Sequence, residues 1–480
     1  MDLIVIGKII GSALSLEAAL MILPLAFTLY YHESPVPFLI PMAIGIAAGF
    51  ILVHTGKKAQ KLKSKEGFVS TGLTWIVLSL VGMLPFMICG SVPNPFDAFF
   101  ETVSGFTTTG SSILKDVEAL PKGVLVWRSF THWIGGMGIL VFMSAIVHFG
   151  DGSQMNLIKA ESPGPEVSKL LPKASDTAKI LYLIYTGLTV VTLAVLVMLK
   201  MPFFDALCIT FGAAGTGGFG VLNSSCADYT TAQQIVITIA MLAFGINFNF
   251  YFLLLIRKTD QALHMEEVWL YLVIVVGAIV LISLDLMISN GFQTPFATIH
   301  NAAFHVGSII TTTGYAMDDI NLWPHLSQCI IVVLMFCGAC AGSTGGGFKI
   351  SRLLLMGKSF SRDLAIQLHP DMVKKVHIDG KTVEEKVIRA TGVYTFVYVM
   401  IIIISLLLIA PNGLDWSSTF TAVMATFNNI GPGIGINGTT GNYSVFSNFS
   451  KVILSADMLI GRLEIFPILA LFRKETWRRF

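Results

Sequence analysis

Charged residues are scarce in this chain: Asp, Glu, Lys and Arg make up only 12% of its 480 residues, whereas 54% are hydrophobic. A soluble domain typically carries about 25% charged residues. The hydrophobic residues also gather in repeated runs of roughly twenty, which is the length of helix that crosses a bilayer. The composition therefore excludes an ordinary soluble domain and predicts an all-α polytopic membrane protein.

Cysteine is sparse as well, with six residues in the chain. All but Cys226 lie in or beside apolar runs, so no disulfide framework is expected. Cys337 and Cys340 form a CxxC pattern, but within an apolar run we expect them to pack as small side chains rather than to bind a metal. The first apolar run is of spanning length and lacks a small-residue cleavage site, so no cleavable signal peptide is expected.

The apolar runs predict ten membrane-spanning segments, near residues 10–31, 35–54, 70–89, 124–148, 179–200, 232–256, 268–289, 326–356, 387–410 and 447–472. Lysine and arginine are almost absent from the connections 32–34 and 201–204. They gather instead in alternate connections, namely 55–67, 150–178, the one that begins at Arg257, 357–386 and the C-terminal tail. Because cytoplasmic connections carry an excess of positive charge, we expect both termini to be cytoplasmic.

Threonine and glycine recur in four short segments, each placed between two long apolar runs. The clearest copy is Thr107-Thr108-Thr109-Gly110-Ser111. Glycines at positions 110, 218, 314 and 431 recur at intervals of about a hundred residues, so the last eight spans form four pairs that each bracket one loop. The loop positions expected to contact a permeating ion are Thr108, Thr109, Gly110, Thr216, Gly217, Gly218, Thr312, Thr313, Gly314, Asn429, Ile430 and Gly431.

A possible helix start lies thirteen residues before each of these glycines, at Asp97, Asp205, Asn301 and Ser418. All four are residue types preferred at helix N-caps. Between cap and glycine there is room for about two to three turns of helix, too few to span a bilayer. We therefore expect four re-entrant half-helices whose partially negative C-termini meet inside the membrane and stabilise a cation. The alternative is that the four residues begin ordinary surface helices in external loops.

The composition of the loops suits coordination of an ion by the backbone. Irregular backbone at membrane depth is tolerated only where it is buried in protein or lines water. Glycine permits the backbone angles that turn successive carbonyls toward one axis, and carbonyl oxygens replace the hydration shell of K⁺ in potassium channels. One Thr/Gly segment is a weak signal, but four copies with matched flanks predict a cation pore made by four non-identical loops.

These motifs resemble the Trk/Ktr/HKT superfamily of potassium transporters, and most closely the membrane subunit of bacterial Trk systems. The resemblance covers essentially the whole chain. Its most specific stretches are Ser104-Gly105-Phe106-Thr107-Thr108-Thr109-Gly110, Asn428-Asn429-Ile430-Gly431-Pro432-Gly433 and Gly461-Arg462-Leu463-Glu464. It implies a pseudo-four-fold pore of four membrane–pore helix–membrane repeats after an N-terminal addition of two helices. The implied boundaries are 1–67 for the addition and 68–150, 151–258, 259–358 and 359–480 for the repeats.

The resemblance also implies an ion, a location and partners. It implies potassium uptake across the plasma membrane, the inner membrane in bacteria, through a gated, channel-like pore with K⁺ as the permeant ion. In plant relatives, serine at the first filter position accompanies sodium transport, so Gly110 favours potassium. The tandem Gly217-Gly218 allows the second loop to align at either glycine. The family further implies a homodimer on cytosolic nucleotide-binding regulatory subunits, for which the basic connection 357–386 offers a docking surface, and no nucleic-acid partner.

The eighth span is interrupted by Ala341-Gly342-Ser343-Thr344-Gly345-Gly346-Gly347-Phe348-Lys349. Since each glycine costs about 1 kcal/mol in a helix interior, this run is not expected to stay helical. A phosphate-binding loop is excluded, because Lys does not directly follow the second glycine and Ile350 follows Lys349. The alternatives are a simple kink or, as the resemblance implies, an intramembrane loop that blocks the pore. The expected gate residues are Gly342, Ser343, Thr344, Gly345, Gly346, Gly347, Lys349 and Arg462.

Arg462 lies within the last span, and an arginine at membrane depth usually faces a water-filled cavity or a partner. Gly461 leaves space beside it, and Glu464 is a possible counter-ion. The alternative is that Arg462 extends to the cytoplasmic interface. The family places an arginine here beneath the filter, where its positive charge opposes cation passage. Asp457 is expected to line the pore, and Asp285 to lie at an interface. His132, next to a run of glycines, is expected to pack between helices.

Three other functions remain as alternatives at this stage. A sodium- or proton-coupled potassium symporter needs an ionisable residue in the pathway, which Asp457 or Glu464 would supply. An intramembrane enzyme needs a catalytic set such as HExxH or paired aspartates at matched depth, which the sequence lacks. A receptor or scaffold leaves the four loops in matched register without an explanation. We therefore expect a transporter rather than an enzyme.

Overall fold

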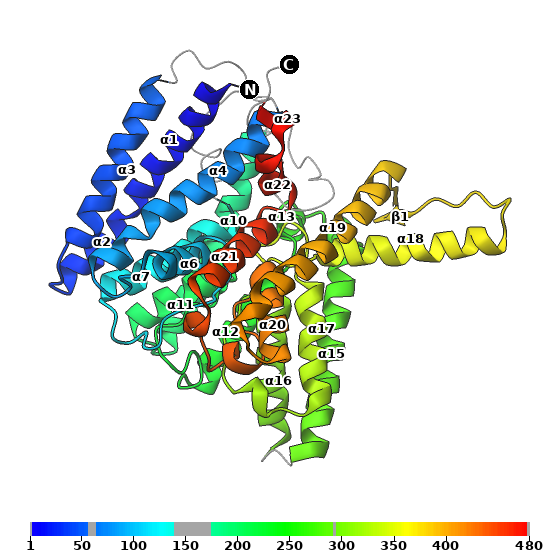
Figure 1. Cartoon of the computed structure of the whole chain (residues 1–480). Coiled ribbons are helices and arrows are strands. Elements are labelled where there is room, and N and C mark those ends of the chain that lie inside the picture. Colours follow the sequence, from blue (N-terminus) through cyan, green and yellow to red (C-terminus); the bar gives the residue numbers. More distant parts are fainter. Residues whose placement is uncertain (1, 56–63, 139–173, 291–293, 478–480) are drawn as a thin grey trace.

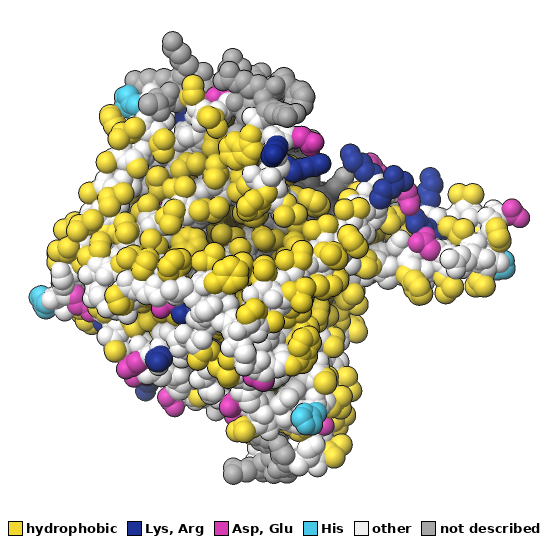
Figure 2. All heavy atoms as spheres, in the orientation of Figure 1, with side chains coloured by type: hydrophobic (Ala, Val, Ile, Leu, Met, Phe, Trp, Pro, Cys, Tyr) yellow, Lys and Arg dark blue, Asp and Glu magenta, His cyan; other side chains and the backbone are white. Residues whose placement is uncertain are grey.

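The computed structural model describes residues 2–55, 64–138, 174–290 and 294–477. Within these ranges the chain is mostly helical, and the strands are limited to one two-stranded hairpin. Six of the described helices, some with a short continuation, are long and apolar enough to cross a membrane, or seven if α12 and α13 form one bent span. Apolar side chains cover a broad part of the surface seen in Figure 2. The prediction of an all-α membrane protein is therefore confirmed.

The chain begins with two spans that pack as an antiparallel pair at one edge of the molecule (Figure 1). The first comprises α1 (Leu3–Leu20) and α2 (Ile22–Tyr30), and the second is α3 (Val36–Thr55). Glycines allow the close approach of α1 and α3: a Cβ atom at Gly49 would lie 2.8 Å from the carbonyl oxygen of Gly11. Two of the ten predicted spans therefore correspond to these helices.

The rest of the chain repeats one order of elements four times: a long helix, a short helix, a glycine loop and a second helix. The long helices are α4 (Ser64–Gly82) with α5 (Leu84–Ile88), α10 (Ala174–Met198), α15 (Glu266–Asn290) and α19 (Glu385–Ile409). The short helices are α6 (Pro95–Phe106), α11 (Phe203–Gly215), α16 (Pro295–Ile310) and α20 (Trp416–Phe427). The second helices are α7 (Lys122–Gly136), α12 (Thr231–Phe244), α17 (His325–Cys337) and α21 (Asn448–Arg462).

The second helices are shorter than the spans predicted for them. The span 232–256 breaks at residues 245–247, and α13 (Phe248–Leu255) continues at 90° to α12. The span 447–472 breaks after Arg462, where Glu464 and Ile465 have positive φ, before α22 (Phe466–Phe472). The span 326–356 is interrupted as expected and resumes as α18 (Ile350–Leu368). The predicted span 124–148 begins in α7 and continues into residues outside the described ranges. Most residues of the basic connections 55–67 and 150–178 also lie outside these ranges.

The predicted helix starts are wrong, although the short helices themselves have 12, 13, 16 and 12 residues, close to the expected length. Their N-caps are Asn94, Pro202, Thr294 and Asp415. Asp97, Asp205 and Ser418 lie in the first turn instead, and Asn301 lies in the second. The earlier start has a physical cause in two helices, because Pro95 and Pro295 occupy the first helical position, where the fixed φ of proline is favourable.

Outside this pattern lie shorter elements, namely α14 (Thr259–Leu263), α23 (Lys474–Trp477), the 3₁₀ turns η1 (Ile320–Leu322), η2 (Ala410–Asn412), η3 (Gly435–Asn437) and η4 (Tyr443–Val445), and the hairpin of β1 (His377–Ile378) and β2 (Lys381–Thr382). Helix α18 and the hairpin project from the side of the molecule (Figure 1). Lysine and arginine side chains gather on this projection and near the C-terminal end of the chain (Figure 2).

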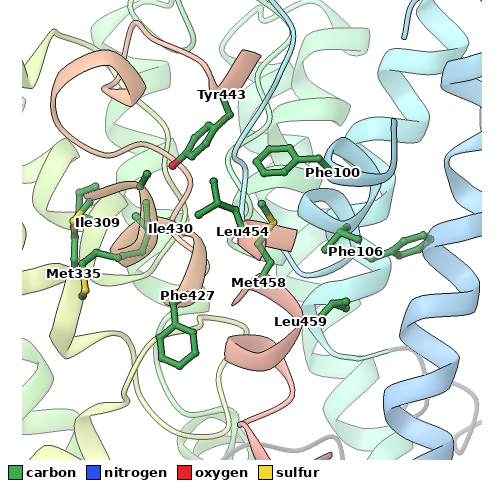
Figure 3. Packing of buried hydrophobic residues seen from close by; sticks show 14 of the residues in the cluster. Phe100, Phe106, Ile309, Met335, Phe427, Ile430, Tyr443, Leu454, Met458 and Leu459 are labelled. Atoms are coloured by element: carbon green, nitrogen blue, oxygen red, sulfur yellow. The ribbon is translucent and has the colours of Figure 1, made fainter. Parts of the chain in front are cut away.

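The buried core comprises a smaller cluster, built mainly from the second repeat, and a large cluster that draws on all four repeats. Its residues come from helices far apart in the sequence, and Figure 3 shows Tyr443 and Phe100 facing each other. Their ring centroids are 5.4 Å apart. Ile430, Leu454 and Met458 lie close to this pair (Figure 3). The packing therefore surrounds the loops with large apolar side chains.

Candidate functional site

The four short helices end in the same way. In each, the residue two positions before the loop glycine has a left-handed backbone, with φ between 54° and 60°, at Thr108, Thr216, Thr312 and Asn429. The next amide donates to the carbonyl five residues earlier: Thr109 to Ser104 (2.9 Å), Gly217 to Gly212 (2.8 Å), Thr313 to Ser308 (2.8 Å) and Ile430 to Ala425 (2.8 Å). This is the Schellman motif, which reverses the chain at a helix end. Glycine is usual at the left-handed position and asparagine is also found there, whereas the three β-branched threonines are strained.

The loop glycines have positive φ as well: 81° at Gly110, 74° at Gly218, 84° at Gly314 and 98° at Gly431. Gly217 is not among the residues with positive φ. The second loop therefore aligns with the others at Gly218, which decides between the two alignments that the sequence allowed. Left-handed backbone at alternate positions turns the intervening carbonyls toward a common direction.

The four loops form a closed ring. A Cβ atom added at Gly110 would lie less than 3.0 Å from the carbonyl oxygen of Gly217 in the next loop. The same close approach recurs between Gly218 and the carbonyl oxygen of Thr313, between Gly314 and that of Ile430, and between Gly431 and that of Thr109. Each glycine therefore accommodates the carbonyl that precedes the glycine of the neighbouring loop. No other residue type fits these positions without moving a backbone carbonyl.

A cavity of about 100 Å³ opens on the side of the ring from which the chain leaves the loops. All four loop glycines line it, together with residues that follow them, including Ser111, Gly220 and Pro432. Arg128 and Tyr443 also line this cavity. The Tyr443 hydroxyl donates to the carbonyl oxygen of Gly431 (2.8 Å), which fixes the exit of the fourth loop.

Side chains of the first and third loops stabilise their own turns. The hydroxyls of Thr107 and Thr109 are 2.8 Å apart, and those of Thr311 and Thr313 are 2.7 Å apart. In the fourth loop, the side-chain amide of Asn429 donates to the Thr109 hydroxyl of the neighbouring first loop (2.9 Å). Thr107 and Thr311 were not among the predicted site residues. Each of them is the first threonine of a TTTG segment, which is their signal in the sequence.

The glycine-rich segment 338–349 connects α17 to α18 and lies on the helix side of the ring. The Gly346 amide donates to the Thr312 hydroxyl (2.6 Å). A Cβ atom at Gly345 would lie 2.8 Å from the carbonyl oxygen of Thr311, and one at Gly346 would lie 2.7 Å from that of Asn428. The segment thus contacts the third and fourth loops directly, on the face opposite the cavity.

Arg462 holds this segment in place. Its guanidinium donates to the carbonyl oxygens of Thr344 (2.8 Å), Gly135 (2.6 Å) and Gly136 (2.6 Å). The side chain is 9% exposed, which contradicts the alternative that it extends to a solvated helix end. Lys349 is buried too, and its ammonium donates to the carbonyl oxygen of Gly345. Two cationic side chains from different elements therefore bind the backbone of the glycine-rich segment.

The prediction that Glu464 is the counter-ion of Arg462 is wrong. Glu464 forms an ion pair with Arg352 of α18, with Oε1 3.1 Å from the guanidinium, and Arg352 also lies 3.9 Å above the ring of Tyr394. The physical reason is the break after Arg462, because positive φ at Glu464 turns this residue out of the helix that carries the arginine. Arg462 is stabilised instead by carbonyl oxygens, which accept charge-assisted hydrogen bonds.

The break between α12 and α13 is joined to the glycine-rich segment. The Cys340 amide donates to the Gly245 carbonyl (3.1 Å), and the Phe248 amide donates to the Gly342 carbonyl (3.0 Å). The buried carboxylate of Glu267, at the start of α15, accepts from the Ala341 amide (2.6 Å) and from Asn247 (3.3 Å). Glu267 was not among the predicted site residues, since no local pattern pairs it with a residue 74 positions later.

The remaining predicted residues have structural partners. The Asp457 carboxylate is buried and accepts a hydrogen bond from Ser405 of α19 (2.7 Å). Asp285 accepts from the amide and hydroxyl of Ser327 (3.0 and 2.6 Å) in the first turn of α17. His132 is buried and stacks on Phe219 with ring centroids 4.2 Å apart, as expected for packing.

No group of three or more His, Cys, Asp or Glu side chains among the described residues could hold a metal ion. The oxygen atoms that the loops bring to the ring are those of backbone carbonyls and threonine hydroxyls. These oxygens suit hard monovalent cations, and they do not form a resident metal centre of the kind that cysteine and histidine build.

Comparison with known proteins agrees with this geometry. The family model TrkH, described as a cation transport protein, matches residues 37–478. The Trk system potassium uptake protein TrkH of Salmonella typhimurium is 35% identical over 98% of this chain and 99% of its own. The Trk system potassium uptake protein TrkG of Escherichia coli is 30% identical over 99% of this chain and 98% of its own.

A solved structure is similar over the full length. The crystal structure of the potassium transporter TrkH from Vibrio parahaemolyticus matches with a TM-score of 0.88 and 30% identity, and all of both chains is covered. These relatives are named as transport proteins and not as enzymes, which confirms the expectation of a transporter. This chain belongs to the TrkH family of cation transport proteins.

Proposed function

We propose that this protein mediates potassium uptake across the plasma membrane through a gated, channel-like pore. The observation that carries the proposal is the closed ring, in which each loop glycine lies against the carbonyl that precedes the glycine of the next loop. The names of the full-length relatives, which are potassium uptake proteins, support potassium as the permeant ion. The negative interior of the cell then supplies the driving force, about 2.3 kcal/mol per charge per 100 mV.

In this proposal the ring is the selectivity filter. The carbonyl oxygens of the loops replace the hydration shell of K⁺, and the four converging helix C-termini contribute partial negative charge. The loop residues proposed to contact the ion are those predicted from the sequence, with the glycines at 110, 218, 314 and 431 as the positions that let the carbonyls approach. The four-fold order of elements supports a pore of four repeats.

We further propose ten spans, with the first two forming an N-terminal addition over residues 1–67 and the repeats following at 68–150, 151–258, 259–358 and 359–480. In this scheme each second helix, together with its continuation after the break, counts as one span. The number of proposed spans is therefore larger than the number of long apolar helices. Both termini are then cytoplasmic. The basic projection formed by α18 and the β1–β2 hairpin lies on the same side and supports docking of a cytosolic nucleotide-binding subunit, on a homodimer of this chain.

The gate in this proposal is the glycine-rich segment 338–349, with Arg462 and Lys349 holding it beneath the filter. The contacts of Gly345 and Gly346 with the third and fourth loops support the position of the segment in the ion path. The positive charges of the two side chains oppose cation passage in the same place. Movement of the segment must break the hydrogen bond between Arg462 and Thr344.

Coupled symport is the alternative mechanism. It needs an ionisable side chain in the ion path, yet Asp457 is hydrogen-bonded to Ser405 and Glu464 is paired with Arg352. A pore predicts potassium flux at fixed voltage that does not follow a sodium or pH gradient. Flux that follows either gradient would favour symport.

The filter is tested by rubidium and potassium uptake in cells that lack their own potassium uptake systems. We expect Gly110→Ser and Gly314→Ser to relax selectivity toward sodium, because each added Cβ displaces a carbonyl of the neighbouring loop. Gly277→Ser in α15 is the matched control, since nothing lies within 4 Å of a Cβ atom at that glycine. Unchanged selectivity in both loop variants would contradict the filter assignment.

A further inference from the structure

The loops are supported from behind by pore-helix side chains in a common register. The side chain nine residues before the loop glycine accepts a hydrogen bond from the backbone amide three residues after that glycine. In the first loop Glu101 accepts from the Ile113 amide (3.0 Å), and in the third His305 accepts from the Met317 amide (3.4 Å). In the fourth loop Thr421, one position earlier, accepts from the Ile434 amide (2.9 Å). The exit of each of these loops is thus tied to its own short helix.

Only the first of these three supports is a charged pair. The Glu101 carboxylate is fully buried and accepts from the Ser112 hydroxyl with both oxygens (3.0 and 3.1 Å) and from Arg128 Nε (2.7 Å). Arg128 is 3% exposed. Two buried charges in contact stabilise each other, whereas removing one partner leaves the other uncompensated.

Arg128 extends this support to the second loop. Its Nη1 donates to the carbonyl oxygen of Gly220 (3.0 Å), two residues after Gly218, and its guanidinium lies 3.5 Å above the ring of Phe219. Glu101 belongs to the short helix of the first loop, and Arg128 to α7. One ion pair therefore ties the exits of two adjacent loops, and Arg128 also lines the cavity where the four glycines meet.

We propose that Glu101 and Arg128 are positioning residues that set the ion selectivity of the ring by fixing the separation of the first and second loops. This inference rests on the proposed function. Gly110 lies against the Gly217 carbonyl, so any relative shift of these two loops moves a carbonyl that faces the ion path. Discrimination between potassium and sodium depends on the number and placement of such carbonyls.

The test compares Glu101→Gln, Arg128→Gln and the double variant in the uptake assay, with the amount of protein in the membrane measured for each. Glutamine at 101 keeps an acceptor for the Ile113 amide but removes the charge. We expect each single variant to lose at least tenfold in the ratio of potassium to sodium uptake. The double variant should regain more than half of this ratio, because it leaves no uncompensated charge.

Asp260→Asn, which removes a 91% exposed carboxylate on α14, is the control expected to match wild type. If the single glutamine variants do not reach the membrane, Arg128→Lys replaces them in the test. This variant should also lose selectivity, because lysine cannot donate to both Glu101 and Gly220 in the same geometry. Wild-type selectivity in Glu101→Gln or Arg128→Lys, or a double variant no better than the singles, would overturn the inference. Absence of potassium uptake by the wild-type protein would instead contradict the proposed function.

Discussion

Removal of the Arg462 guanidinium should open the proposed gate. Among the described contacts of its guanidinium, the hydrogen bonds to Gly135 and Gly136 stay within the helical body, whereas the one to the Thr344 carbonyl (2.8 Å) holds the glycine-rich segment. A hydrogen bond to a charged group contributes about 1.5–3 kcal/mol. Since about 1.4 kcal/mol is a factor of ten in an equilibrium constant, its loss should raise the ratio of open to closed protein roughly 10- to 100-fold.

The assay is rubidium uptake into liposomes that contain the purified protein without any regulatory subunit. If the closed state dominates in wild type, basal uptake rises nearly in proportion to the open fraction. We expect this increase for Arg462→Gln and Arg462→Ala. Arg462→Lys retains the positive charge but cannot reproduce the three-carbonyl geometry, so it separates the effect of the hydrogen bond from that of the charge.

Arg473→Ala is the matched control, because the Arg473 side chain is 76% exposed on the C-terminal tail. It should show wild-type basal uptake. Wild-type basal uptake in Arg462→Ala and Arg462→Gln, with normal amounts of protein, would refute the assignment of Arg462 to the gate. An increase in both neutral variants but not in Arg462→Lys would show that the charge, rather than the hydrogen bond, keeps the pore closed.

Two further predictions concern the surroundings of the ring. Glu267→Ala removes the acceptor of the Ala341 amide (2.6 Å) and should raise basal rubidium uptake about tenfold, since a buried amide left unpaired costs about 1–3 kcal/mol in the closed state; an unchanged rate would argue against Glu267 as a restraint on the segment. Hydrogen bonds from Ser417 and Ser418 lower the pKa of Asp415, the N-cap of α20, to about 2. Because this pKa is below its unfolded value of about 3.9, the contribution of Asp415 to stability is complete above pH 4 and is lost as the pH falls toward 2. Asp415→Ala should therefore lower the thermal unfolding temperature of the purified protein at pH 7, and the difference from wild type should narrow below pH 4; a constant difference down to pH 2.5 would contradict this role.

The sequence alone determined the class of protein, the four loops and the interruption before Lys349. These features are encoded locally: apolar runs of spanning length are visible by composition, and glycine is required wherever a backbone adopts positive φ or approaches another backbone. The glycines at 110, 218, 314 and 431 satisfy both conditions, so their regular spacing can be recognised in the sequence without the structure. Helix starts are encoded less strictly. The first short helix begins at Pro95, with Asn94 as its N-cap, and not at Asp97 as predicted.

Only the tertiary structure decided the partners of the charged residues. Glu464 is next but one to Arg462 in sequence, yet it pairs with Arg352, 112 positions away, because the helix breaks between them. Glu101 and Glu267 carry no local signal, since partners such as Ser112, Arg128 and Ala341 lie 11 to 74 positions away in the sequence. The alignment of the second loop at Gly218 likewise required its φ of 74°. Long-range pairing depends on how helices meet in space, and a single sequence does not record which of its many polar residues are brought together.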